Sequence, residues 1–525
     1  QQGYKSDMNG AESLIRALLT GGVEVCFTNP GTSEMHVVAA LDRVSEIRCV
    51  LGLFEGVVTG AADGYARMAG KPACTLLHLG PGLANGVANL HNASRAHVPI
   101  VNIVGQHALH HLCYDPPLAS DIEAIARPYS KWLRTSQAAA DIRRDATDAI
   151  VAANAPPGQI ATLIVPADVA WDEISSGERN TGNIPTFPMA PKPDSGKIER
   201  AAEMLRSGLR TAILLSDKAL YGKGLDAAGR IAAGTNAKLL APYPFTRMER
   251  GEGLPAVERM HYVLEQAVEQ LKEFRQIILV GSLAPVSYFA YPGKNSVLTS
   301  PDCVLHTLAS PNEDLAGALN ALAAEFSPND RSPVPAKAER PPVPSGEISS
   351  HGVATAVAAL LPENTIVVDE SMTSGRGLMA ATKGCPRHDW LANTGGSIGI
   401  AMPLAVGAAI ASPNRRVLCF SADGSGMYTA QALWTMAREN LNVTTVIFAN
   451  RAYAVLRREY SSLGVGDPGP RAADLFDIGR PELDWVSLAR GMGVPGTRVT
   501  TLDTFVKALQ EGFLTDGPTL VEVRI

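Results

Sequence analysis

Short apolar runs rich in Val, Ile and Leu recur along this chain, and segments long enough for a helix separate them. Continuous runs of this kind, bounded by Gly, Pro and polar residues, are typical of strands buried on both faces of a parallel sheet. The pattern therefore predicts an α/β protein built from doubly wound parallel sheets with helices on both faces. The runs are VEVCFTNPG, IRCVLGL, ACTLLHLGPG, PIVNIVGQ and ATLIVPADV, then TAILLSD, AKLLAPY and IILVGSLAPV, and finally TIVVDES, VLCFSADGS, VTTVIFANR and PTLVEV.

Two stretches rich in Pro, Gly and Ser divide the chain. They are residues 175–196 and 327–346, and such a composition favours extended, exposed connections. The blocks that remain are 8–175, 195–330 and 345–525, and we expect one α/β domain in each. A length of 525 residues suits three domains at ~150 residues per domain.

Composition excludes several classes of protein. The net charge is -6 and no basic run is interleaved with aromatic residues, so we expect no nucleic-acid partner. The seven cysteines form no C-x-x-C pair and mostly lie in apolar runs, which indicates buried, reduced thiols and a cytoplasmic location. The segment before Met8, QQGYKSD, has no apolar core, so we expect an expression remnant there and not a secretory signal.

Residues 390–414 carry no charge and could be mistaken for a membrane span. Several glycines and Pro403 interrupt this segment, whereas a spanning helix needs ~20 predominantly apolar residues. We therefore predict a buried glycine-rich loop that leads into a core helix, and no membrane association.

Polar residues follow the predicted strands at the edge where open parallel sheets bind ligands. They are Asn29-Pro30-Gly31-Thr32, His78, Gln106, Glu370-Ser371, Asp423-Gly424-Ser425 and Asn450.

The segment Ala422–Gly426 follows the run VLCF, and a helix is predicted over residues 427–439. A helix N-terminus suits a phosphate because its N–H groups are free and its dipole is positive. Asp423 and Asn450 lie 27 positions apart (450 − 423), so one strand–helix–strand unit can bring both side chains to one sheet edge. Carboxylate and amide oxygens are hard ligands of the kind that Mg²⁺ or Ca²⁺ takes. A tight turn in which Asp or Ser caps a helix is the open alternative.

Two further motifs could carry chemistry. Glu55 lies at a strand–helix junction among apolar residues and glycines, where a carboxylate must be hydrogen-bonded or its pKa rises. It is either a first-turn helix charge or a catalytic acid. In residues 395–399, GGSIG, the glycines let the backbone approach a ligand, and Ile398 either contacts that ligand or fills a core.

Taken in this order, these segments resemble the thiamine diphosphate-dependent decarboxylase and synthase family, which includes acetolactate synthase, pyruvate decarboxylase and benzoylformate decarboxylase. ADGS followed by Asn450 is similar to the family's GDGS…N signature, and FEGVVTGAADGYAR is similar to its segment around a conserved glutamate. TNPGTSE resembles its early NPG loop, and GGSIGIAMP resembles the loop around the pyrimidine amino group. The resemblance covers essentially the whole chain and implies pyrimidine-binding, central and diphosphate-binding domains.

The resemblance also implies thiamine diphosphate and Mg²⁺ as cofactors. Asp423, Asn450 and the backbone oxygen of Ala452 match the magnesium ligands. Glu55 matches the glutamate that bonds the aminopyrimidine, and Ile398 the residue that keeps the cofactor bent. The other expected cofactor contacts are Glu370, Ser371, Gly396, Gly424, Ser425 and Tyr453.

One residue departs from the cofactor signature. Ala422 stands where the family usually has Gly. A methyl group is tolerated there only if the φ angle is negative, so a positive φ would indicate strain at the cofactor site.

Substrate-side residues follow from the same resemblance. His78 matches the active-site histidine of benzoylformate decarboxylase and is expected to transfer a proton, with a structural histidine as the alternative. Thr32 matches a small hydroxyl residue near the substrate of that enzyme, and Gln106 matches a glutamine of acetolactate synthase.

Two departures put benzoylformate itself in doubt as the substrate. The segment APVSYFAYPG has no histidine where benzoylformate decarboxylase has its second one, so Tyr288, Phe289 or Tyr291 would lie there. Glu459 falls near an aryl-binding phenylalanine of that enzyme, and it either makes the pocket more polar or faces solvent.

Other cofactors are not expected. YGKGLDAAGR is a lone glycine-rich turn, so we predict no FAD. The neighbouring histidines His107, His110 and His111 lack an evident fourth ligand for zinc.

The resemblance implies decarboxylation of a 2-oxo acid with carboligation to a second carbonyl compound, as in acetolactate synthase. The alternatives are a simple decarboxylase of the benzoylformate decarboxylase type, a flavin-dependent oxidase on the same scaffold, and a non-catalytic regulatory subunit, which the presence of Glu55 disfavours. Each active site of the family combines the first domain of one subunit with the third domain of another. We therefore expect a homodimer or homotetramer with shared active sites.

Overall fold

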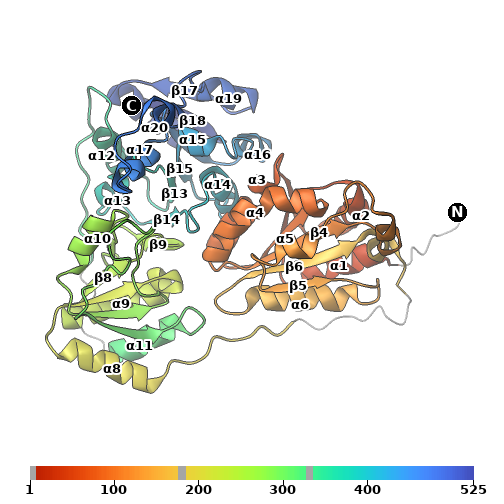
Figure 1. Ribbon diagram of the computed structural model, residues 1–525, viewed down its shortest axis with the longest axis horizontal. Coiled ribbons are helices and arrows are strands. Elements are labelled where there is room, and N and C mark those ends of the chain that lie inside the picture. The colour runs from red at the N-terminus through yellow and green to blue at the C-terminus, as the bar shows by residue number, and fades with distance from the viewer. Residues whose placement is uncertain (1–7, 175–184, 327–334) are drawn as a thin grey trace. The chain divides into compact units, whose positions relative to one another are not determined.

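A computed structural model describes residues 8–174, 185–326 and 335–525, and it contains three β-sheets with helices on their faces (Figure 1). The two expected linkers fall partly on residues 175–184 and 327–334, which lie outside the described ranges. The chain divides into two compact units. The first comprises Gln1–Met189, Gly395–Asn414 and Thr429–Leu441, and the second comprises Ala190–Thr394, Arg415–Tyr428 and Asn442–Ile525.

The first sheet lies in the first unit, and all its strands run parallel in the order β2-β1-β3-β4-β6-β5. Its strands are β1 (Val25–Asn29), β2 (Arg48–Leu51), β3 (Ala73–Leu77), β4 (Ile100–Gln106), β5 (Trp132–Thr135) and β6 (Ile160–Pro166). The helices of this unit are α1 (Gly10–Thr20), α2 (Met35–Arg43), α3 (Glu55–Ala69), α4 (Leu79–Arg95), α5 (Ile122–Ala126), α6 (Ile142–Asn154), α7 (Ala167–Trp171), α14 (Ala401–Ala411) and α16 (Ala432–Arg438), with short 3₁₀ helices η1 (Thr32–Glu34) and η2 (Leu109–Tyr114).

The second unit holds the other two sheets. One is parallel, in the order β10-β8-β7-β11-β12, and the other has the order β17-β18-β16-β15-β13-β14-β9. Their strands are β7 (Thr211–Leu215), β8 (Lys238–Ala241), β9 (Arg247–Arg250), β10 (Glu258–Arg259), β11 (Gln276–Val280), β12 (Val304–Ala309), β13 (Ile366–Glu370), β14 (His388–Ala392), β15 (Val417–Ala422), β16 (Val443–Ala449), β17 (Gly496–Val499) and β18 (Thr519–Arg524). The helices are α8 (Ser195–Arg206), α9 (Gly222–Thr235), α10 (Leu264–Leu271), α11 (Leu315–Ala324), α12 (Ser350–Leu360), α13 (Leu378–Ala381), α15 (Asp423–Gly426), α17 (Ala454–Ser462), α18 (Pro470–Leu475), α19 (Trp485–Gly491) and α20 (Leu502–Leu514), with the 3₁₀ helix η3 (Asp217–Leu220).

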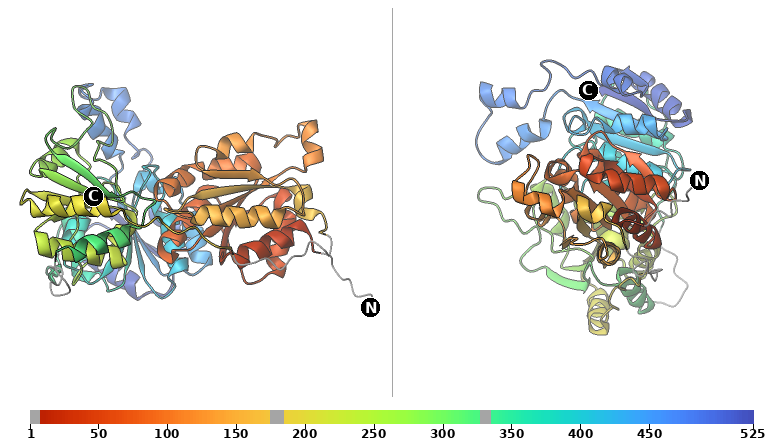
Figure 2. Two further views of the ribbon diagram at one scale, coloured as in Figure 1. Left: turned by 90° about the horizontal axis from the view of Figure 1, so that it is seen from below. Right: turned by 90° about the vertical axis from the view of Figure 1, so that its right-hand side faces the viewer.

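Burial on both faces of the sheets explains the continuous apolar runs. In β7, Ile213 and Leu215 pack into the core beneath α8, α9 and α11, whereas Ala212 and Leu214 pack on the opposite face with α10. Successive strand residues point to opposite faces, so a sheet covered on both sides needs apolar residues at every position. In the first unit, α1 and α6 pack into the core on one face of the sheet, and α3 and α4 contact its strands as a separate pair (Figures 1 and 2). The predicted α/β class with doubly wound parallel sheets is confirmed.

Strand β9 departs from the expected pattern. It lies in the middle block of the sequence, yet it pairs antiparallel with β14 at the edge of the third sheet. An added antiparallel strand covers an edge that would otherwise expose unpaired backbone groups. The sheet of the third block is therefore mostly, and not wholly, parallel.

The uncharged segment 390–414 folds as expected into a loop and the core helix α14. Ten of the eleven residues of this helix are buried, so it has no polar face. Within the described ranges, no helix has the length and apolar character needed to cross a membrane.

The helix predicted over residues 427–439 is shorter than expected. One helical turn, α15, begins at Asp423, and a second helix, α16, begins only at Ala432. Between them, the Thr429 hydroxyl donates to the Gly399 carbonyl at 2.6 Å. This long-range bond holds the intervening residues in turns.

The thiols are only partly as expected. All seven cysteines are free, and Cys26, Cys74, Cys385 and Cys419 are buried. Cys49 is exposed because it lies in β2, the edge strand of the first sheet, and Cys113 is exposed because it lies in the surface 3₁₀ helix η2.

Candidate active site

Four neighbouring strands of the first sheet, β2, β1, β3 and β4, end at one edge and place Glu55, Thr32, His78 and Gln106 there. Glu55 is the first residue of α3 and only 8% of its surface is exposed. The Asn85 amide donates to Glu55 Oε2 at 3.0 Å. Glu55 Oε1 has no hydrogen-bond partner in the described part of the chain, and this oxygen is not fully buried. One oxygen of this carboxylate is therefore held and the other is available.

A close approach explains the glycine at position 82. A Cβ atom on Gly82 would lie 3.3 Å from Glu55 Oε1 and 3.4 Å from the His78 Cβ atom. The first turn of α4 therefore leaves room on the side of Glu55 that Asn85 does not occupy.

The other predicted residues of this edge differ in exposure. Thr32 is exposed in η1. Gln106 ends β4, is buried, and its side-chain oxygen accepts from the His107 N–H at 2.8 Å. His78 precedes α4 and is half-buried.

Glu34 is the residue of this edge that the sequence analysis did not single out. It is 1% exposed, and its Oε2 atom lies 2.8 Å from His78 Nδ1 and accepts from the Gly31 N–H at 2.8 Å. The spacing of Gly31 and Glu34, three positions apart before a helix, is that of a capping box and could have drawn attention to it.

The histidines after β4 have different surroundings. His107 Nε2 is buried and has no hydrogen-bond partner within the described ranges. Burial, followed by the charges of His111 and His78, lowers the pKa of His107. His110 Nδ1 lies 3.5 Å from Asp168. Over the ranges that the structure describes, no group of three or more His, Cys, Asp and Glu residues could hold a metal ion.

The glycine-rich loop before α14 is tied to α4. The Gly395 carbonyl lies 3.0 Å from His91 Nε2, and the Asn92 amide donates to the Ser397 carbonyl at 2.8 Å. Gly396 has a φ angle of 78°, which favours glycine, and it is exposed. Ile398 is half-buried, so it does not fill a core.

The second group of predicted residues lies in the second unit, at the ends of β16, β15 and β13. Asp423 follows β15 and is buried, and Asn450 follows the adjacent strand β16. Asp423 Oδ1 accepts from the Gly424 N–H at 2.9 Å, and Oδ2 accepts from the Arg451 N–H at 2.7 Å. Asn450 Oδ1 accepts from the Ala452 N–H at 3.0 Å.

Backbone geometry here supports the two side chains. Ala422 has φ −92° and ψ 156°, so its methyl group causes no strain. Arg451 has φ 58°, an uncommon conformation for a residue other than glycine. A Cβ atom on Gly424 would lie 2.5 Å from the Tyr453 ring, so only glycine lets that ring pack against the turn. Ser425 is buried, and its hydroxyl contacts the Ala422 carbonyl at 3.4 Å.

The donor set at this edge fits a diphosphate-bound cation. Burial raises the pKa of Asp423, although the Arg451 and Gly424 N–H groups oppose the rise. Its hydrogen-bond donors within the described ranges are backbone N–H groups and not a basic side chain. A buried carboxylate beside an amide oxygen is the type of ligand pair that Mg²⁺ takes, with phosphate and water completing the shell.

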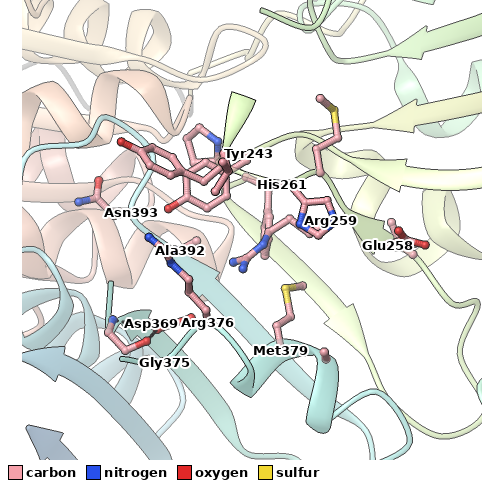
Figure 3. Close-up of a pocket in the computed structure, with 18 of the residues that line it drawn as sticks. Tyr243, Glu258, Arg259, His261, Asp369, Gly375, Arg376, Met379, Ala392 and Asn393 are labelled. Carbon is pink, nitrogen blue, oxygen red and sulfur yellow. Dashed lines mark hydrogen bonds between the residues drawn. The ribbon is translucent and has the colours of Figure 1, made fainter. Parts of the chain in front are cut away.

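Glu370 ends β13 and Ser371 follows it, and both line a cavity of about 780 Å³ within the second unit (Figure 3). Glu370 accepts from the Asn393 amide at 3.0 Å, and Ser371 donates to Asp369. In Figure 3 the Arg259 and Arg376 side chains project into this cavity near Tyr243. Neither arginine forms an ion pair in the described part of the chain.

Glu459 is not a solvent-facing residue. Its two carboxylate oxygens accept from the Tyr262 hydroxyl at 3.2 Å and from the Tyr291 hydroxyl at 2.7 Å. Burial, with Glu459 as a hydrogen-bond partner, raises the pKa of Tyr291 to about 12. Tyr288 and Phe289 extend an aromatic cluster that also contains Tyr262.

Comparison with known proteins gives a consistent result. Residues 8–118 match the family described as "Thiamine pyrophosphate enzyme, N-terminal TPP binding domain", and residues 375–523 match "Thiamine pyrophosphate enzyme, C-terminal TPP binding domain". "Putative acetolactate synthase large subunit IlvX" of Mycobacterium tuberculosis is 53% identical over 517 residues, which cover 98% of this chain and 99% of that protein. Benzoylformate decarboxylase of Pseudomonas aeruginosa is 28% identical over 533 residues, covering 96% of each chain. Among solved structures, Rhodococcus jostii RHA1 thiamine diphosphate-dependent 4-hydroxybenzoylformate decarboxylase superposes with a TM-score of 0.84 and 25% identity, covering 98% of this chain and 99% of that one.

Proposed function

Because the chain belongs to the thiamine pyrophosphate enzymes, we propose that it decarboxylates a 2-oxo acid with thiamine diphosphate and Mg²⁺ and joins the product to a second carbonyl compound, as an acetolactate synthase does. The extensive identity to a protein named as an acetolactate synthase large subunit supports this reaction. The proposal includes the three domains 8–175, 195–330 and 345–525, a cytoplasmic location, and a homodimer or homotetramer with shared active sites.

The buried carboxylate of Glu55 is the observation that carries the proposal. Asn85 holds Oε2, and Oε1 remains available to protonate or bond a ring nitrogen of the cofactor. Glu55 can therefore hold or release a proton at Oε1 while Asn85 keeps the group in place.

Asp423, Asn450 and the Ala452 carbonyl would hold Mg²⁺, and Gly424, Ser425, Tyr453, Glu370 and Ser371 would surround the diphosphate end. When bound, thiamine diphosphate supplies the electron sink that lets a 2-oxo acid lose CO₂. Gly396 would accept from the cofactor's amine through its carbonyl, and Ile398 would support the cofactor's bent shape.

The substrate side of the proposal rests on the first unit. His78 would give or take a proton, and Thr32 and Gln106 lie at the ends of the neighbouring strands β1 and β4. A simple decarboxylase of the benzoylformate decarboxylase type is the second candidate, because the Glu34–His78 pair would suit protonation of the product.

A panel of 2-oxo acids, incubated with thiamine diphosphate and Mg²⁺, tests the reaction. CO₂ release and the ligated product are both measured. We expect CO₂ release together with a ligated product. CO₂ release with only the simple aldehyde would favour the decarboxylase.

The role of Glu55 is tested by Glu55→Gln. General acid–base catalysis contributes ~10²–10⁴-fold, so we expect turnover to fall at least ~100-fold with an unchanged melting temperature. Glu123→Gln, which alters a more exposed helix carboxylate of the same unit, is the matched control and should retain turnover. Normal turnover of Glu55→Gln would refute the mechanism.

A further inference from the structure

The Glu34 carboxyl is buried beneath the edge that carries His78. Glu34 ends η1, directly after β1, and His78 follows the adjacent strand β3. Glu34 is 1% exposed, whereas the His78 side chain is 23% exposed. A buried carboxylate needs partners for its charge, so the placement of Glu34 calls for a reason.

The partners of Glu34 are asymmetric. Oε2 accepts from the Gly31 N–H at 2.8 Å and lies 2.8 Å from His78 Nδ1, whereas Oε1 is buried and has no hydrogen-bond partner among the residues that the structure describes. Burial raises the pKa of Glu34, and His78, followed by the Gly31 N–H, opposes the rise. His78 and the Gly31 N–H are therefore the groups that offset the effect of burial on this carboxyl.

Two glycines make room for this pair. A Cβ atom on Gly31 would lie 2.3 Å from His78 Cγ and Nδ1, and a Cβ atom on Gly105 would lie 1.6 Å from Glu34 Oε1. Both distances are far below normal contact, so the backbone is shaped around the imidazole and the carboxyl. The close approach of Gly31 confines the plane of the His78 ring, and the 2.8 Å contact with Glu34 Oε2 directs Nδ1 toward the carboxyl.

We propose that Glu34 is a positioning residue that keeps a proton on His78 Nδ1 and thereby leaves Nε2 as the nitrogen that exchanges a proton with the substrate. Nε2 has no hydrogen-bond partner among the described residues, and this nitrogen is not fully buried. This inference rests on the proposed function. When Nε2 takes a proton, the carboxylate balances the imidazolium charge, and when Nε2 gives it up, the Nδ1 proton stays in place.

Other titratable groups face this pair from each packed element. Glu55 approaches from α3 across Gly82, and His107 and His111 lie beyond β4. Because burial lowers the pKa of His107, that ring stays neutral near pH 7 and adds no competing charge. Glu34 is therefore the acidic group in direct contact with His78 Nδ1.

The ring nitrogens can be observed without turnover. We would label histidine with ¹⁵N in the full-length protein and identify the His78 signals by their loss in His78→Ala. At alkaline pH we expect Nδ1 to show the shift of a protonated nitrogen and Nε2 that of an unprotonated one, and the reverse assignment in the wild type would overturn the proposal. This measurement also separates the inference from the reaction, because it requires no substrate.

A double-mutant cycle tests whether Glu34 acts through His78. We expect Glu34→Gln to lower kcat at least tenfold with KM within threefold, and to change kcat less than twofold in a His78→Ala background. Asp145→Asn is the control, since Asp145 is an equally buried carboxylate of the same unit that pairs with Arg134 and Ser136. It should leave kcat and the His78 signals unchanged. Losses that multiply in the double variant would show that Glu34 is only structural.

Discussion

The contact between α3 and α14 yields a prediction with a defined size. Both helices belong to the first unit, and they approach so closely that each needs a glycine. A Cβ atom on Gly64 of α3 would lie 2.1 Å from the Leu404 carbonyl oxygen. A Cβ atom on Gly407 of α14 would lie 1.9 Å from the Ala61 carbonyl oxygen. The clashing atoms are backbone, so neither can be relieved by a rotamer change.

Gly64→Ala should therefore force the helices apart by roughly 1 Å, since Cβ contacts below about 3 Å do not persist. A gap of 0.5–1 Å forfeits about a quarter to a half of the dispersion energy of the atoms that face it, and overpacking of this kind costs about 1–3 kcal/mol. The better helix propensity of Ala returns up to about 1 kcal/mol. Because the clash at 2.1 Å is with a backbone oxygen, the cost should lie near the upper end of its range, at about 2–3 kcal/mol, which leaves a net destabilisation of about 1–2 kcal/mol.

The same shift should affect function. α14 directly follows the loop that carries Gly396 and Ile398, and α3 begins at Glu55. A displacement near 1 Å can cost up to about 100-fold in rate when it misplaces reacting groups. Thermal unfolding, thiamine diphosphate affinity by calorimetry, and kcat/KM with the preferred 2-oxo acid would be measured together.

Gly491→Ala is the matched control for this experiment. Gly491 ends α19, and a Cβ atom there would meet nothing within 4 Å. This variant should keep its melting temperature or gain slightly, with unchanged activity. An unchanged melting temperature and a kcat/KM within twofold of the wild type for Gly64→Ala would refute the packing argument.

Two further predictions follow from buried or strained residues. His388 is 2% exposed, and burial, followed by the Arg250 charge, lowers its pKa to about 3. The imidazole is therefore neutral in the folded protein, and stability is lost as the pH falls below ~6.5, the pKa of histidine in the unfolded chain. Between pH 7.5 and pH 5, protonation of His388 in the unfolded chain should lower the free energy of unfolding by about 2 kcal/mol (~1.5 pH units at ~1.4 kcal/mol each). Urea unfolding at several pH values should show that His388→Asn lacks this loss of stability. An equal pH dependence in the wild type and the variant would contradict the neutral state of His388 in the folded protein. Arg451 has φ 58°, a conformation that Asn tolerates better, so Arg451→Asn should raise the free energy of unfolding by about 1 kcal/mol and the melting temperature with it. A lower melting temperature would show that the exposed contact of Arg451 with Glu482 matters more.

The sequence predicted much of the fold because the strands are buried on both faces. Runs such as TAILL and VTTVIFA need no partner strand to be recognised, since apolar character at every position is sufficient. Six strands escaped because they are short or contain polar residues such as His388 and Asp389; they are β5, β9, β10, β12, β14 and β17. Those polar residues are satisfied by distant groups, for example Arg247 on Asp389, which no local pattern reveals.

The candidate site was predicted in part for the same reason. Residues at strand ends, such as His78, Asp423 and Asn450, follow directly from the strand assignment, because parallel strands share one carboxyl edge. Glu34 was missed because its importance lies in a contact with a residue 44 positions away. Glu459 was left open for a similar reason, since its partners Tyr262 and Tyr291 come from another part of the chain.

The sequence by itself determined which segments become buried strands and which chemical groups follow them, because both depend on local residue type and period. Only the tertiary structure decided that Glu34 faces His78 Nδ1, that β9 leaves its block to pair with β14, and that the helix expected over residues 427–439 breaks where Thr429 bonds to Gly399. These outcomes depend on long-range packing, in which a single hydrogen bond or a missing Cβ atom outweighs local preference. The sequence therefore determines which residues lie at the ends of the strands, whereas distant neighbours determine the orientation of each functional side chain.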